Sequence, residues 1–168
     1  GDEMAAPLLR VIRSRRLRLV SAVRHLMEMD LEGRDALASA LGVNVPKVWP
    51  PDLYGAGAIR FALQELAECA EHGWSFWYLV IRGNPGELAG IAGFKGWPDQ
   101  NGSVEIGYSV LSQHQRQGLA SEAVQRLVGW AFTHHNVMEV SAETFPYLRQ
   151  SIKVLEKNGF RHTGVGSE

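Results

Sequence analysis

The hydrophobic period of this chain changes from that of a strand to that of a helix between residues 103 and 131, and this change strongly constrains the fold. Residues 103–110 (SVEIGYSV) have the pattern of a β-strand. A helical face follows, with apolar positions at Ala120, Ala123, Val124, Leu127, Val128 and Ala131. Because the strand feeds the helix through one turn, we expect a ligand site where the two meet.

The remaining patterns predict a mixed α+β fold in a single domain over residues 1–168. Before residue 103 we expect strands at 17–22, 74–82 and 88–94, and helices at 23–32, 34–41 and 59–72. After the long helix we expect a strand at 139–143, a helix at 148–158 and the start of a last strand at 160–164. The three strands that precede the long helix are joined by turns and form an antiparallel meander.

Composition and charge exclude several kinds of partner. The chain has 17 basic and 18 acidic side chains, so no overall field favours nucleic acid or a membrane surface. No apolar run reaches the roughly 18 residues that cross a bilayer. The arginines between residues 10 and 18 are predicted to form the solvated face of the first strand. The single cysteine, Cys69, is predicted to pack in a helix, which fits a reducing compartment and a cytoplasmic protein.

The turn at residues 111–120 (LSQHQRQGLA) carries the chemistry that the sequence indicates. Backbone N–H groups at a helix start lack intrahelical acceptors and lie at the positive end of the helix dipole, so they can hold an anion such as a pyrophosphate. Gly118 and Ala120 would let that anion approach closely, although both could equally be plain packing residues. The turn is not a P-loop or a dinucleotide fingerprint, because the glycine patterns of both are absent.

Three motifs in order resemble the GNAT superfamily of acetyl-CoA-dependent N-acetyltransferases. Gln115-x-x-Gly118-x-Ala120 is similar to the Gln/Arg-x-x-Gly-x-Gly/Ala signature of that superfamily. Residues 105–108 (EIGY) and 151–160 (SIKVLEKNGF) resemble the branch that contains ribosomal-protein N-terminal acetyltransferases. The resemblance implies a mostly antiparallel sheet that splays at the cofactor site between flanking helices. It also implies an enzyme that moves an acetyl group from acetyl-CoA to a primary amine by direct attack in a ternary complex.

The resemblance further implies the contacts with acetyl-CoA. Backbone amides of the turn would bind the CoA pyrophosphate, and the end of the preceding strand would hold the pantetheine arm and polarise the acetyl carbonyl. The implied cofactor-binding residues are Ser109, Val110, Gln115, Arg116, Gln117, Gly118, Leu119, Ala120 and Ser121. No metal is expected, because His134 and His135 are adjacent in the sequence and suit the negative end of the long helix better than shared ligation.

Acetyl transfer requires a base for the amine and stabilisation of the departing thiolate. Glu105 is the first candidate for the base, directly or through water, and Glu143 is the second; Glu105 could also be an exposed strand residue or the partner of an arginine. Many superfamily members place a tyrosine near the thiolate, but the matching residue here is Leu155. We therefore predict Ser151 as its substitute, with a serine bonded back to its own helix as the alternative.

The predicted acceptor contacts are Trp49, Trp77 and Phe94, each of which could instead be a core residue. An aromatic pocket suits a small amine or a peptide N-terminus. The alternative function is a non-catalytic acyl-CoA-binding sensor or interaction module of the same fold, motivated by the missing tyrosine. Superfamily members usually have a further strand after residue 164, so we expect a short or truncated last strand whose open edge would favour a homodimer.

Overall fold

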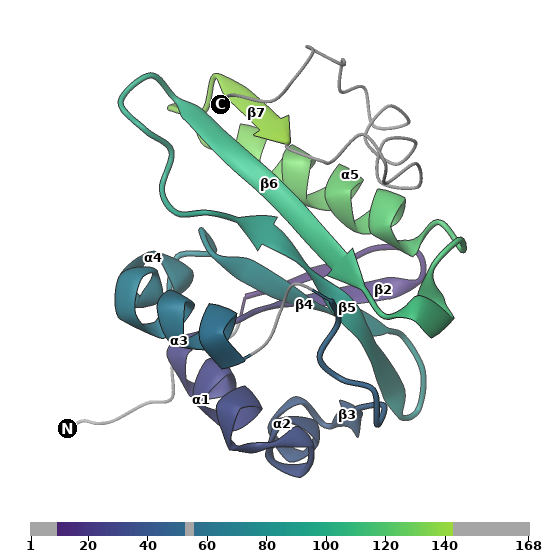
Figure 1. Cartoon of the computed structure of the whole chain (residues 1–168). Coiled ribbons are helices and arrows are strands. Elements are labelled where there is room, and N and C mark those ends of the chain that lie inside the picture. Colours follow the sequence, from purple (N-terminus) through teal and green to yellow (C-terminus); the bar gives the residue numbers. More distant parts are fainter. Residues whose placement is uncertain (1–9, 53–55, 143–168) are drawn as a thin grey trace, which may run out of the picture.

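The computed structural model describes residues 10–52 and 56–142 (Figure 1). Its elements in chain order are β1 (Val11–Arg13), β2 (Leu17–Ser21), α1 (Arg24–Glu32), α2 (Arg34–Leu41), β3 (Val43–Asn44), α3 (Ala56–Glu65), α4 (Ala67–Ala70), β4 (Phe76–Ile81), β5 (Gly86–Phe94), β6 (Ser103–Val110), the 3-10 turn η1 (Ser112–His114), α5 (Leu119–Phe132) and β7 (Glu139–Ala142). The helix expected at 148–158 and the strand expected at 160–164 lie outside the described residues.

The strands form one seven-stranded sheet, which confirms the mixed fold class. Its order is β1-β2-β4-β5-β6-β7, and β3 pairs with the first two residues of β5. Neighbours from β1 to β6 run antiparallel, whereas β7 runs parallel to β6. Strands β4, β5 and β6 are the predicted meander, and β6 leads through η1 into α5. The point where strand meets helix is therefore at the end of β6.

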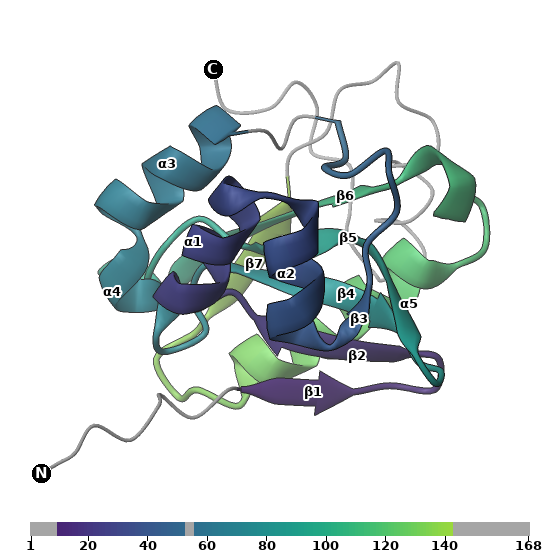
Figure 2. The same cartoon turned by 90° about the horizontal axis from the view of Figure 1, so that it is seen from below.

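Helices cover both faces of the sheet (Figures 1 and 2). On one face α5 packs its buried residues Leu119, Ala123, Val124, Leu127 and Ala131 against alternate residues of β2, β4, β5 and β6. On the other face α1, α2 and α3 cover the intervening strand residues, which include Val20, Tyr78, Val80 and Leu88. This alternation follows from the opposite direction of successive side chains along a strand.

An aromatic cluster joins α5 to the meander. Trp130 of α5 lies 4.7 Å from Trp74, 5.4 Å from Trp77 and 5.7 Å from Phe94, measured between ring centroids. Trp77 is fully buried, and its indole N–H donates to the Gly73 carbonyl at 2.9 Å. The imidazole Nδ1 of His134 lies 3.1 Å from the carbonyl oxygens of Trp130 and Ala131, which confirms that this side chain meets the end of the helix.

Two parts of the fold differ from the sequence prediction. The N-terminal arginines do not lie on a single strand, because the chain turns between β1 and β2 and forms a hairpin with Val11 opposite Val20. The helix expected at 59–72 is divided into α3 and α4 at Leu66. Backbone hydrogen bonds still cross that division, from Leu66 to Ala62 and from Ala70 to Leu66, both at 2.8 Å. The periodicity therefore predicted the buried face correctly and missed the local change in direction.

We predict that Trp77→Ala lowers the free energy of unfolding by about 3–5 kcal/mol, because it leaves a cavity in a fully buried site. Urea denaturation followed by circular dichroism would measure this change. Trp97→Ala is the matched control, because its side chain is 50% exposed, and we expect a loss below about 1 kcal/mol. Equal losses in the two variants would contradict the packing described for Trp77.

Candidate functional site

The outer edge of β6 is paired with β7 along its first half. This pairing covers Ser103 to Ile106, whereas the pairing of β6 with β5 continues to Val110. Ile106 lies opposite Ala142, the last residue that the structure describes. The end of β6, at Val110, lies next to the turn that leads into α5.

The direction of the backbone groups along this edge follows from the antiparallel register. The Leu111 N–H donates to the Ala89 carbonyl at 2.8 Å, and the Lys95 N–H donates to the Glu105 carbonyl at 3.3 Å. Odd-numbered residues of β6 therefore point their backbone groups toward β5, and even-numbered ones point theirs toward the outer edge. Val110 directs its backbone outward, and its carbonyl accepts a hydrogen bond from Gln115 Nε2 at 2.9 Å.

Ser109 plays a different part from the one the sequence predicted. The backbone groups of Ser109 face β5. The backbone groups that point to the outer edge at this end of β6 are therefore those of Val110. The Ser109 hydroxyl instead donates to the carbonyl of Asp52 at 2.5 Å. Ser109 thus joins β6 to the loop that follows β3.

A glycine in β5 allows the two strands to approach closely at this position. Gly90 lies opposite Val110, and a Cβ atom built on it would be 2.5 Å from the Ser109 carbonyl oxygen and 2.8 Å from Val110 Cα. The register of β4 with β5 also shifts here, between Leu79 and Val80, so that Ala89 is an extra residue in β5. The bulge at Ala89 and the lack of a side chain at Gly90 together allow β5 to lie close to β6 at Val110.

The turn from β6 to α5 has two residues in the left-handed region. Arg116 has φ 64° and Gly118, the N-cap of α5, has φ 81°. No side chain caps this helix start. The amides of Gly118, Leu119 and Ala120 have no intrahelical acceptor by helix geometry, so the turn presents donors and the positive dipole end to the same place. This arrangement can hold an anion.

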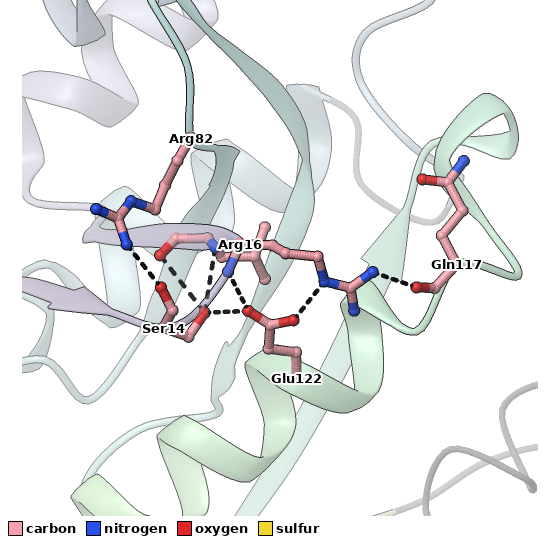
Figure 3. Close-up of polar contacts among 6 residues, drawn as sticks. Ser14, Arg16, Arg82, Gln117 and Glu122 are labelled. Atoms are coloured by element: carbon pink, nitrogen blue, oxygen red, sulfur yellow. Dashed lines mark hydrogen bonds and ion pairs between the residues drawn. The ribbon is translucent and has the colours of Figure 1, made fainter.

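The carboxylate of Glu122, in the first turn of α5, binds polar groups of the β1–β2 hairpin (Figure 3). Its Oε2 accepts hydrogen bonds from the Ser14 hydroxyl at 2.5 Å and the Arg16 backbone N–H at 2.7 Å. Its Oε1 lies 2.7 Å from Arg16 Nε in an ion pair. Burial raises the pKa of Glu122, but the hydrogen bonds from Ser14 and Arg16 and the Arg16 charge outweigh this and lower the pKa.

Glu105, the predicted base, lies in β6 between the buried residues Val104 and Ile106, which face α5. Its side chain therefore points to the opposite face, which is also the face of Ser109. Lys95 Nζ lies 3.2 Å from Glu105 Oε2, and the Glu105 side chain is 33% exposed. Glu105 therefore forms an ion pair with a lysine. In the alternative to the catalytic role, the sequence had indicated an arginine as the partner.

The three predicted acceptor aromatics are packing residues in this structure. Trp77 and Phe94 are buried in the core beneath α5. Trp49 is 8% exposed on the opposite face, where its indole N–H donates to Asp30 Oδ1 at 3.0 Å. Tyr78 donates to the other oxygen of Asp30 at 2.8 Å, so this carboxylate fixes Trp49 against β4. Trp49 therefore presents little surface to solvent.

Part of the predicted chemistry lies outside the described residues. This applies to Ser151 and Glu143, and to Leu155, where many superfamily members have a tyrosine. Sequence reasoning also missed the Ser14–Arg16–Glu122 network. Its signal was a glutamate in the first helical turn together with an arginine-rich N-terminal segment, but spacing alone could not bring together residues more than 100 positions apart.

The end of β6 and the start of α5 therefore form a site, in a mixed α+β fold, that can hold an anion. The sequence model of the acetyltransferase (GNAT) domain matches residues 24–161. The chain therefore belongs to the GNAT family and is an acetyltransferase. It is 29% identical over 150 residues to YjdG, an uncharacterised N-acetyltransferase of Bacillus subtilis, with 89% of each chain covered.

Solved structures share the fold at low sequence identity. A ribosomal-protein alanine acetyltransferase from Vibrio fischeri superposes with a TM-score of 0.66 at 19% identity, covering 92% of this chain and 85% of that one. The ribosomal-protein α-N acetyltransferase RimL, solved in complex with coenzyme A, gives a TM-score of 0.63 at 20% identity, with 92% and 86% covered. The predicted resemblance to the GNAT superfamily is confirmed, and ribosomal-protein acetyltransferases are among the solved structures that share the fold.

Neither a metal cluster nor a membrane span is found in the part of the chain that the structure describes. No three histidine, cysteine, aspartate or glutamate side chains there gather as metal ligands. No helix among the same residues has the length and apolar character needed to cross a bilayer.

The low pKa of Glu122 predicts a stability that depends on pH. Because the folded pKa lies below the usual 4.5, the ionised carboxylate stabilises the fold at neutral pH, and this contribution is lost as pH falls through the folded pKa. Glu122→Gln should therefore melt below the parent protein at neutral pH, and the gap should close in acid. Thermal melts between about pH 7 and 3 would measure it, with exposed Glu28→Gln as control. A gap that is constant across this range would contradict the assignment.

Proposed function

We propose that this acetyltransferase binds acetyl-CoA along the outer edge of β6, with the diphosphate at the start of α5. The observation that carries the proposal is the continuity of the two features: the outward-facing backbone of Val110 leads within one turn to the uncapped amides at Gly118. An extended thioester arm needs backbone hydrogen-bond partners, and a diphosphate needs a helix start. The chain offers both in the order in which acetyl-CoA would need them.

The residues around the turn fit a diphosphate. Gly118 adopts φ 81° without a side chain that would crowd the amides, and Ala120 adds only a methyl group. Gln115 is fixed to the Val110 carbonyl, and so links the anion site to the strand edge. We assign the cofactor contacts to Val110 and residues 115–121, with Ser109 acting indirectly through Asp52.

Acetyl-CoA supplies an activated thioester, and the protein supplies position and a base. We propose Glu105 as that base, directly or through water, because it faces away from α5 on the same side of β6 as Ser109. Its side chain is 33% exposed, so water or an amine can reach it. Ser151 remains our proposal for the hydroxyl that meets the leaving thiolate, and Glu143 our second candidate for the base.

We propose a primary amine as the acceptor, either a peptide N-terminus or a small amine. The acceptor would approach between β6 and the loop after β3, because this is the side of β6 that Glu105 faces. The likeness to RimL and to a ribosomal-protein alanine acetyltransferase supports a peptide N-terminus. We also propose a cytoplasmic location, in keeping with a single, buried cysteine, and a homodimer that gel filtration would test.

The assay that tests the proposed function is calorimetric binding of acetyl-CoA, followed by thiol release on addition of amines and peptides. Binding and release together would establish the catalytic reaction at this site. Binding without release from any acceptor would favour the acyl-CoA sensor, for which the non-tyrosine residue Leu155 is the supporting observation. Absence of binding would overturn the cofactor assignment.

We predict that Glu105→Gln lowers kcat at neutral pH by about 10²–10⁴-fold, the usual contribution of a general base, with little effect on acetyl-CoA binding. The rise of kcat with pH should also flatten. Steady-state kinetics across pH would measure both, with the exposed Glu28→Gln as control. An unchanged pH profile would show that a group other than Glu105 is the general base.

We predict that Gly118→Ala raises the Kd for acetyl-CoA, because Gly118 is left-handed and any side chain strains the helix start. Gly129→Ala in the same helix is the matched control. A Cβ there meets nothing within 4 Å, so that variant should keep its Kd and gain about 0.5–1 kcal/mol of stability. Calorimetry and urea denaturation of both variants provide the test, and an equal Kd in both would contradict the role of Gly118.

A further inference from the structure

The side chain of Arg16 reaches from the β1–β2 hairpin to the turn that precedes α5 (Figure 3). Its Nε lies 2.7 Å from Glu122 Oε1, and its Nη1 donates to the Gln117 carbonyl at 2.6 Å. Its Nη2 lies 3.1 Å from the position that a Cβ on Gly118 would occupy. One guanidinium therefore contacts the turn and the first helical turn, and it lies beside the N-cap.

Further hydrogen bonds hold the β1–β2 hairpin in position beside α5. Ser14 donates its hydroxyl to Glu122, and its carbonyl accepts from Arg82 Nη1 at 3.1 Å. The backbone N–H of Arg16 adds another bond to the same carboxylate. Because main-chain and side-chain groups of the hairpin converge on Glu122, the position of Arg16 is fixed by more than its own flexible side chain.

The negative charge of Glu122 would oppose the binding of an anion at the start of α5, and the charge of Arg16 offsets it. A glutamate in the first turn stabilises a bare helix start but repels an anion bound at the same place. Arg16 neutralises that carboxylate through an ion pair in which the Glu122 side chain is only 15% exposed. It also engages the Gln117 carbonyl, whose negative oxygen would otherwise be available to face an incoming anion.

We propose that Arg16 is a positioning residue for the diphosphate of acetyl-CoA: it holds the Gln117–Gly118 turn with its amides available and cancels the charge of Glu122. This inference rests on the proposed binding of acetyl-CoA at α5. The hairpin lies outside residues 24–161, which the family model matches, so the assignment comes from the contacts in this chain.

The test compares two acetyl donors that share the thioester arm. We expect Arg16→Gln to weaken binding of acetyl-CoA by about tenfold, the size of one charge-assisted interaction, and to leave S-acetylpantetheine, which has no diphosphate, unaffected. Calorimetry would measure the first Kd, and kcat/KM at excess acceptor would compare the two donors. The matched control is Arg15→Gln, an exposed neighbour in the same hairpin turn.

Two further variants separate charge from geometry. Arg16→Lys should restore part of the affinity through charge, but not all, because lysine lacks the planar fork that serves Glu122 and Gln117 together. The double variant Arg16→Gln with Glu122→Gln should bind acetyl-CoA better than Arg16→Gln alone, because no uncompensated carboxylate remains. Equal weakening toward both donors, or no gain in the double variant, would overturn the proposal.

Hydrogen exchange in the ligand-free protein gives a readout that does not depend on the cofactor. The Glu122 amide, which donates to the Gly118 carbonyl at 3.0 Å and closes the first turn of α5, should exchange faster in Arg16→Gln than in the parent or in Arg15→Gln. If the parent protein fails to bind acetyl-CoA, the proposed function is rejected. If exchange in Arg16→Gln equals that in the parent, the positioning role of Arg16 is rejected, whatever the result for the parent. Faster exchange with normal binding would reject the effect on affinity.

Discussion

Strand β6 pairs with β5 up to Val110 and then leads through one turn into α5, and the candidate site depends on this connection. By the antiparallel register, Val110 directs its backbone groups away from β5. Outward-facing backbone groups of this kind suit an extended ligand that supplies hydrogen-bond partners. The bulge at Ala89 and the close approach at Gly90 shape the paired side of β6.

The start of α5 combines opposite electrostatic demands. The helix dipole and the amides attract an anion, while the carboxylate of Glu122 repels it. The arginine from the hairpin balances this carboxylate and contacts the turn at the same time. The two ends of the described chain are thus joined at the place where a phosphate group would bind, and the hairpin contributes to the site without contributing a catalytic group.

Periodicity predicted most of the secondary structure and the strand-to-helix turn at the candidate site, because both depend on local patterns. The meander, the long helix and the Gln115–Ala120 turn are of this kind. The burial of Trp77 and Phe94, the outward direction of Val110 and the contact of Arg16 with Glu122 are not. They depend on strand register and on which face α5 covers, and register is set by pairing between distant segments that composition does not reveal. Aromatic residues are especially ambiguous, because core and pocket use the same side chains.

The hydrogen bond from Ser109 to Asp52 joins the strand that we propose binds acetyl-CoA to the loop beside which we propose the acceptor binds. Such a connection can couple the two binding equilibria. If acetyl-CoA shifts β6 and thereby Asp52, it changes the affinity for the acceptor by some factor, and the acceptor must change the affinity for acetyl-CoA by the same factor. The size of that factor then depends on this one hydroxyl as much as on either pocket.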